Sequence, residues 1–291
     1  MARRADHGSA VSSDTSEVTV LRHSLLHAGR LAGLATLLSA CAPALRTAPP
    51  LAELAGGAVP GRAEAPGLVE QARALYAMRQ LREVRDAAAV ALRAAAADPG
   101  NDETIVVAVR ALVWLADHET ATAAREQAST RAVQAAQWCG AGRPPSPACE
   151  FWRGAALGVQ ARERPTTGVA ALPAIEAAFK AAAAGDPAYD KGAPDQALAL
   201  LYLRAPGWPT GPGDPERGLA HARRAVAIGP DHPPNLLALG EALTATGDAA
   251  GGRSRLEEAL ALARSAAATG DPEAAEWVRD AEVAIARADR R

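Results

Sequence analysis

The feature that most constrains the fold of this chain is a repeat with a period of 34 residues. The two copies share a glycine–aspartate pair, a second glycine and three apolar residues, which are Gly213-Asp214, Gly218, Ala222, Ala225 and Ile228 in the first copy and Gly247-Asp248, Gly252, Leu256, Ala259 and Leu262 in the second. The apolar residues recur every three or four positions, which is the spacing of one face of an α-helix. Aspartate suits the start of a helix, because its carboxylate accepts a hydrogen bond from a free backbone N–H. The repeat therefore predicts equivalent helices in stacked units.

The chain has the same helical character from residue 67 onward. Alanine dominates a hydrophobic fraction of 49%, and aromatic residues contribute only 3%. Ala and Arg are strong helix formers, and small side chains let helices pack closely. Segments of helical spacing predict about four hairpins and a final helix, from Pro272 to about Arg287. Because 34 residues is the period of TPR repeats, we predict an all-α fold in which TPR-like helical hairpins stack as a short solenoid, with a C-terminal capping helix.

The N-terminal segment has the features of a bacterial lipoprotein signal peptide. An apolar run over residues 31–40, too short to span a bilayer, ends directly before Cys41. The segment Leu38-Ser39-Ala40-Cys41 resembles the lipobox, in which the signal is removed and the new N-terminal Cys is acylated. We therefore predict a signal peptide over residues 1–40 and lipidation at Cys41. The alternative for Cys41 is an ordinary buried thiol in an N-terminal helix.

The segment after the lipobox predicts a tether. Residues 41–66 are rich in Ala, Pro and Gly and have no periodic apolar face, so we expect a flexible linker between the lipid and a folded domain at residues 67–291. The signal places the protein in the cell envelope, facing the periplasm. Ala42, by resemblance to the enterobacterial sorting rule, favours the outer membrane over the inner membrane.

Two cysteines flank a loop that contains two consecutive prolines. Cys139 and Cys149 would lie in an oxidising compartment if the signal is functional, so we predict a disulfide between them. The alternative is a pair of free buried thiols. A metal site is less favoured, because only His118 lies near in sequence and the spacing matches no zinc pattern. We predict no metal and no cofactor.

The stretch from Asp186 to Asp248 resembles the T-component family of TRAP transporters, which are bacterial TPR-like lipoproteins that partner periplasmic solute-binding proteins. The matching features are Asp190-x-Gly192, the Leu/Ala run before Ala205-Pro206, Gly213-Asp214, Ala225-Val226, Pro230 and Asn235. The helix around Trp152 and the lipobox also fit. The resemblance implies a membrane-tethered accessory protein that docks a solute-binding subunit. The family is associated with self-assembly around a helix-lined pore or groove, which leaves a homo-oligomer open for this chain.

Candidate groove residues follow from the TPR pattern. In a TPR hairpin the first helix lines the inner groove, which here would present Leu237, Glu241 and Thr244, with Asn235 at the start of the helix. Short apolar and weakly polar groups of this kind suit an extended or apolar ligand. The sequence lacks the Lys/Arg/Asn set that clamps a C-terminal carboxylate in some TPR proteins.

An unusual Trp lies in the Pro-Gly-Trp-Pro turn before the repeat. Trp208 has no helix face under which to pack, so either it folds back onto Tyr202 and closes the end of a hairpin, or it lies at the rim of a groove or anchors an interface. We include Trp152, Tyr202 and Trp208 among the candidate ligand or partner residues.

No catalytic residues are predicted. The sequence contains no HExxH, GxSxG or P-loop motif. The densest titratable cluster, Asp117-His118-Glu119, falls at a helix junction and is typical of a solvated cap. A net charge of -2 and a pI near 6.3 give no reason to expect nucleic acid as a partner.

The sequence therefore predicts a non-enzymatic, lipid-anchored, TPR-like binding protein that faces the periplasm. The first hypothesis is an accessory subunit that engages a solute-binding protein, with an apolar ligand as a further option. The alternative is a structural or assembly scaffold of the envelope with no small-molecule ligand.

Overall fold

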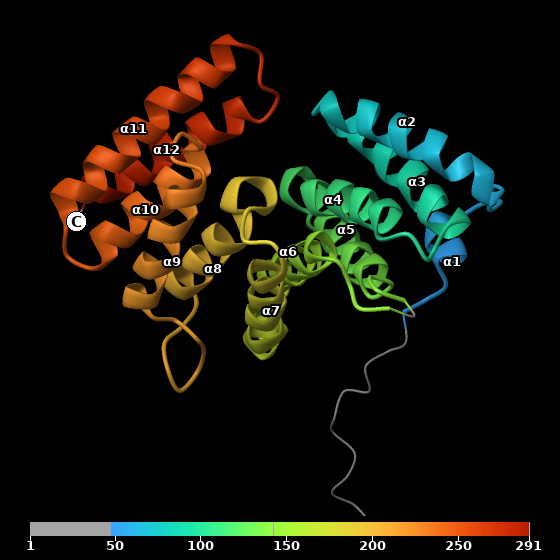
Figure 1. The fold of residues 1–291 in the computed structure, drawn as a ribbon, viewed down its shortest axis with the longest axis horizontal. Coiled ribbons are helices and arrows are strands. Elements are labelled where there is room, and N and C mark those ends of the chain that lie inside the picture. The colour runs from blue at the N-terminus through green and yellow to red at the C-terminus, as the bar shows by residue number, and fades with distance from the viewer. Residues whose placement is uncertain (1–47, 142, 291) are drawn as a thin grey trace, which may run out of the picture. The chain divides into compact units, whose positions relative to one another are not determined.

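A computed structural model describes residues 48–141 and 143–290 and contains twelve α-helices and two short 3-10 helices (Figure 1). Within these residues no strand is formed, apart from a single bridge between Gly207 and Gly213. The described residues belong to one unit, which spans Thr47–Arg291. The elements are α1 (Leu51–Ala55), η1 (Arg62–Glu64), α2 (Ala65–Ala77), α3 (Leu81–Ala97), α4 (Asp102–His118), α5 (Thr122–Ala136), α6 (Pro147–Glu163), α7 (Pro165–Gly185), η2 (Tyr189–Gly192), α8 (Ala193–Arg204), α9 (Pro215–Ile228), α10 (Pro233–Ala245), α11 (Ala249–Ala268) and α12 (Ala274–Ala288).

Successive helices pack as antiparallel hairpins, which confirms the predicted all-α, TPR-like solenoid. The hairpins are α2–α3, α4–α5, α6–α7, α8–α9 and α10–α11, so the described chain has five rather than about four. Helix α12 packs on α11 and α10 as the predicted capping helix. The core is rich in alanine, and its larger members include Leu92, Ile105 and Leu112, which are at most 1% exposed.

The 34-residue repeat corresponds to α9 and α11, the second helices of the last two hairpins. Asp214 accepts a hydrogen bond from the backbone N–H of Arg217 at 3.1 Å, and Asp248 accepts one from Gly251 at 2.9 Å, as predicted for the N-caps. The repeated glycines lie where a first helix approaches closely. A Cβ on Gly218 would lie 3.0 Å from the Leu203 side chain, and one on Gly252 would lie 2.8 Å from the Gly240 carbonyl oxygen.

The start of the described chain differs from the predicted flexible tether. Leu51 and Leu54 of α1 are 3% and 9% exposed and pack into the core formed with α3 and α5. Trp138 Nε1 donates a hydrogen bond to the Pro49 carbonyl at 3.0 Å, and Arg131 donates one to the Leu54 carbonyl at 2.8 Å. The sequence did not indicate α1, because five residues are too few to show a helical period. The predicted signal and Cys41 lie outside the described residues.

The loop between α5 and α6 is closed by a disulfide and by a buried carboxylate. Cys139 and Cys149 form the disulfide, with their Cα atoms 5.6 Å apart. Asp102, which is 6% exposed, accepts hydrogen bonds from the backbone N–H groups of Gly140 at 3.1 Å and Ser146 at 2.9 Å. Burial alone would raise the pKa of Asp102, but these bonds and Arg143 outweigh it and lower the pKa.

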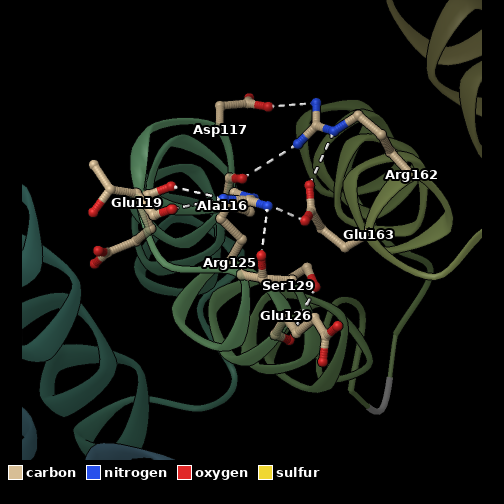
Figure 2. A network of polar contacts seen from close by, with 10 residues as sticks. Ala116, Asp117, Glu119, Arg125, Glu126, Ser129, Arg162 and Glu163 are labelled. Atoms are coloured by element: carbon tan, nitrogen blue, oxygen red, sulfur yellow. Dashed lines mark hydrogen bonds and ion pairs between the residues drawn. The ribbon is translucent and has the colours of Figure 1, made fainter.

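The cluster at residues 117–119, predicted to be a solvated cap, instead forms ion pairs between helices. Figure 2 shows the pair that Asp117 makes with Arg162. Glu119 is 9% exposed and binds Arg85 of α3, and Asp117 binds Arg162 of α6. Glu163 accepts hydrogen bonds from Arg162 and from Arg125 of α5. The charged residues at this junction therefore connect α3, α4, α5 and α6, because each carboxylate binds an arginine from another helix.

A second polar network joins α7, α8 and α9. The Tyr202 hydroxyl, at the end of a side chain that is 1% exposed, donates to Glu176 at 2.7 Å, and Arg217 lies over the Tyr202 ring at 4.0 Å. Burial alone would raise the pKa of Glu176, but hydrogen bonds from Lys180, Tyr202 and Arg217 outweigh it and lower the pKa from 4.5 to about 2.

This network predicts a dependence of stability on pH. Because the pKa of Glu176 is lower in the folded state, its contribution is present above about pH 4.5 and is lost as the pH falls towards 2. We expect Glu176→Gln to lower the free energy of unfolding by about 1–2 kcal/mol at pH 7, a value reduced because Lys180 and Arg217 are half-exposed. Urea unfolding at pH 7 and near pH 3 measures this difference. An effect that is equal at the two pH values would contradict it.

Candidate functional site

A large cavity of the described chain lies where the first helices meet the last ones. It encloses about 800 Å³ and is bordered by α2, α4, α6, η2, the start of α10 and the α11–α12 loop. Aromatic rings and charges of both signs line it, and the residues used below are Tyr76, Arg79, Arg110, Trp152, Tyr189, Asp190, Lys191, His232, Glu273 and Trp277. We call this space the inner cavity.

One carboxylate joins the two ends of the solenoid across the inner cavity. Glu273, just before α12, accepts hydrogen bonds from Arg79, which follows α2, and from Arg110 of α4 at 3.1 Å. Arg79 and Glu273 are 194 residues apart in sequence. Two arginines from the start of the chain therefore share one glutamate from its end.

The two arginines are also held against aromatic rings. The Arg79 guanidinium lies 3.9 Å from the centroid of the Tyr76 ring, and that of Arg110 lies 4.9 Å from Tyr76 and 5.7 Å from Trp152. These are cation–π distances, and the flat guanidinium can stack on a ring while its N–H groups point elsewhere. Burial raises the pKa of Tyr76, although Arg110 and Arg79 oppose the shift, so this hydroxyl stays protonated at neutral pH.

The backbone around the inner cavity contains three strained residues. Arg79, Asp190 and Lys191 have φ of 50°, 44° and 60°, and they are the non-glycine residues with positive φ in the described chain. Such conformations cost on the order of 1–3 kcal/mol each and persist only where their surroundings hold them. All three line the cavity.

Asn235 holds the turn that contains two of these residues. Its side chain is fully buried, and its amide nitrogen lies 2.8 Å from the Lys191 carbonyl, 2.9 Å from that of Ala225 and 3.1 Å from that of Gly229. On the opposite side of the turn, Trp152 Nε1 donates to the Tyr189 hydroxyl at 2.9 Å. The residues that carried the family resemblance, Asp190-x-Gly192 and Asn235, thus meet in one turn beside the cavity.

Two lining side chains contain buried nitrogen atoms with no hydrogen-bond partner in the described structure. They are Nε of Arg110 and Nδ1 of His232. Burial lowers the pKa of His232, and Lys191 adds to this, so its imidazole is neutral at pH 7 and one ring nitrogen can accept a hydrogen bond. Both atoms are buried, so neither is itself exposed to the cavity.

The arrangement is suited to binding. Among the described residues, no group of three or more His, Cys, Asp or Glu is placed to hold a metal ion. Aromatic faces can pack apolar or planar groups, the Arg110 N–H can donate to a carbonyl or carboxylate, and Asp190 and Lys191 offer one charge of each sign.

The seven residues predicted from the sequence to form a groove do not share one surface. Trp152 lines the inner cavity, whereas Glu241 and Thr244 line a separate pocket of about 230 Å³ near the end of α12. Leu237 is 8% exposed, and Tyr202 and Asn235 are buried in the polar contacts described above. Trp208 is 89% exposed, so it does not fold back onto Tyr202.

Sequence reasoning missed most of the inner cavity. Tyr76, Arg110, His232 and Trp277 belong to separate helices, and nothing in their spacing connects them. Two local signals of helix ends were available. The stretch from Tyr76 to Arg79 ends α2 without a glycine, and His232 lies directly before the two prolines that begin α10. Each marks a helix end, which is where a solenoid of this kind exposes polar groups.

Comparison with known proteins supports the fold and no specific family. No protein-family model matches the sequence, and no curated protein matches it. The structure is similar to the crystal structure of a thermophilic TPR protein of Thermus thermophilus, with a TM-score of 0.55 and 18% sequence identity, over 75% of this chain and 99% of that chain. At this identity the likeness shows a TPR-like fold alone.

The shared carboxylate predicts coupling between the two ends of the solenoid. Glu273→Gln leaves Arg79 and Arg110 without a counter-charge, so we expect a loss of about 1–2 kcal/mol in stability. Amide hydrogen exchange should become faster in α2 and in α12 together. The matched control is Glu257→Gln, whose partner Arg253 is on the same helix and exposed. Faster exchange confined to α12 would contradict the coupling.

Proposed function

We propose that this protein binds an extended segment of a protein partner in the inner cavity. The observation that carries the proposal is a cavity of about 800 Å³ that presents the rings of Tyr76, Trp152 and Trp277 beside charged side chains of both signs. A TPR-like solenoid offers such a surface on a rigid frame, because each helix is fixed by its neighbours.

A peptide fits this lining better than a small ion does. Its backbone carbonyls can accept hydrogen bonds from the arginines of the lining, and its N–H groups can donate to the Asp190 carboxylate. The aromatic rings can contact apolar or proline side chains, and they do so at a low cost in conformational entropy. Most arginines of the lining are already paired with carboxylates, so a highly charged ligand is not favoured.

We further propose that the protein is a lipoprotein of the cell envelope that resembles a TRAP-transporter T-component and engages a periplasmic solute-binding protein. The lipobox-like segment ending at Cys41 and the Asp190–Asn235 turn support this reading, and the disulfide between Cys139 and Cys149 is consistent with an oxidising compartment. The alternative is an envelope assembly scaffold, which would bind a different protein partner in the same cavity.

Affinity purification of the full-length protein from its own cells tests the partner. We expect a solute-binding protein to co-purify with the wild type and to be lost with Trp152→Ala and with Trp277→Ala, while the exposed control Val283→Ser retains it. Recovery of envelope assembly factors instead would favour the scaffold. Partners that are retained by both tryptophan variants would contradict binding in the inner cavity.

Metabolic labelling with palmitate tests the anchor. We expect the label on the wild type and its loss in Cys41→Ala, with weaker association of the variant with the membrane fraction, because each buried CH₂ group of the acyl chains contributes about 0.8 kcal/mol. A label that survives Cys41→Ala would contradict the predicted anchor and would leave the inner cavity unaffected.

A further inference from the structure

The α8–α9 loop carries a large apolar side chain that nothing in the described structure covers. Trp208 is 89% exposed, the most exposed of the large hydrophobic residues described. The loop itself is held by hydrogen bonds from Gly213 N–H to the Pro206 carbonyl at 2.9 Å and from Asp214 N–H to the Tyr202 carbonyl at 2.9 Å. The indole therefore projects from a fixed loop, and its exposure is not a consequence of a free chain.

The neighbouring surface of α7 is also apolar. The loop packs against α7, because a Cβ on Gly211 would lie 3.0 Å from Cδ1 of Leu172. Val169, one turn earlier, is 44% exposed. The exposed face of α7 continues with small apolar residues and one exposed charge, Lys180, which is paired with Glu176; the apolar residues are Ala170, Pro173, Ala174, Ala177, Ala181 and Ala184. We call Trp208, Val169 and this face of α7 the apolar edge.

Helix α7 is apolar in composition although much of it is exposed. Its window Gly168–Gly185 has a mean hydropathy of 1.2, enough by length and composition for a membrane span, yet only 22% of the window is buried. The opposite face of α7 packs into the protein through Ile175, Ala178 and Phe179. The helix is thus part of the solenoid, and it can lie on a bilayer but not cross it.

The length of the chain before the fold limits how far the predicted anchor can lie from the start of α1. Pro49 is fixed to Trp138, and seven residue steps from Cys41 to Ala48 span at most about 25 Å. In Figure 1 the described chain enters α1 from the lower side of the view, and α7 and the α8–α9 loop project toward that same side. A lipid on Cys41 would therefore keep the start of the fold within that reach of the bilayer.

We propose that the apolar edge contacts the membrane interface, with the Trp208 indole inserted at the level of the lipid headgroups. Trp favours this layer because its ring is apolar and its N–H finds polar partners. The contact gives the protein a second membrane attachment and fixes its orientation. The orientation rests on the proposed anchor at Cys41, whereas the lipid contact of Trp208 does not.

Quenching of tryptophan fluorescence by brominated lipids tests the contact. The acylated full-length protein is placed in phosphatidylethanolamine and phosphatidylglycerol vesicles that contain brominated acyl chains. We expect bromine to quench part of the emission, and Trp208→Phe to remove most of that quenched part. Trp277→Phe, which alters a half-buried ring of the inner cavity, should leave it unchanged.

Vesicle sedimentation of the Cys41→Ala protein measures the contact without the anchor. We expect Trp208→Ala to weaken partitioning by about tenfold, since a covered Trp buries about 150–250 Å². Val169→Ser should weaken it less, and the matched control Val283→Ser, at 47% exposure on α12, should not. These positions are exposed, so circular dichroism should report an unchanged fold in every variant.

The outcomes separate the contact from the anchor. Quenching and partitioning that do not depend on Trp208 would overturn the contact, as would crosslinks from position 208 to a protein and not to lipid. Absence of palmitate on Cys41, together with Trp208-dependent sedimentation, would overturn the anchor and retain the contact.

Discussion

The constraint on which this structure depends is that no hairpin can bury its own alanine-rich faces. A buried alanine removes little apolar area from water, so each helix needs close neighbours on more than one side. Glycines at the crossings permit this approach, as Gly154 shows, where a Cβ would lie 2.7 Å from the Phe179 ring. Stability is therefore distributed along the stack, and a break between two hairpins would expose both sides of the junction.

Ion pairs made by arginine connect neighbouring helices, which alanine side chains cannot do. Arg85, Arg125 and Arg162 join α3 to α6 through Glu119, Glu163 and Asp117, and His221 and Arg224 of α9 bind Asp195 of α8. Exposed ion pairs contribute little, but here Glu119, Glu163 and Asp195 are buried while their arginines reach them from nearer the surface. The charged residues thus select which helices meet, and they add specificity to a core of nearly uniform side chains.

The sequence was sufficient to predict the helical architecture but not the inner cavity. Helix positions followed from periodic apolar residues, prolines and Asp caps, and the 34-residue repeat gave the stacking, because all of these signals are local. The inner cavity is not local, since Arg79 meets Glu273 across 194 residues. Asn235 illustrates the limit: its motif was visible, but its role, which is to hold the turn at Lys191, depends on a contact that only the folded chain makes.

The strain around the inner cavity argues that its side chains have a use beyond folding. Glycine at positions 190 and 191 would adopt the left-handed backbone without penalty, as Gly192 does with a φ of 92°. The chain instead has Asp190 and Lys191 there and holds them with a fully buried Asn235. A purely structural turn would gain from glycine, because strain that stabilises nothing only lowers the free energy of unfolding. The two charged side chains are therefore better explained by what they meet in the cavity than by the fold that presents them.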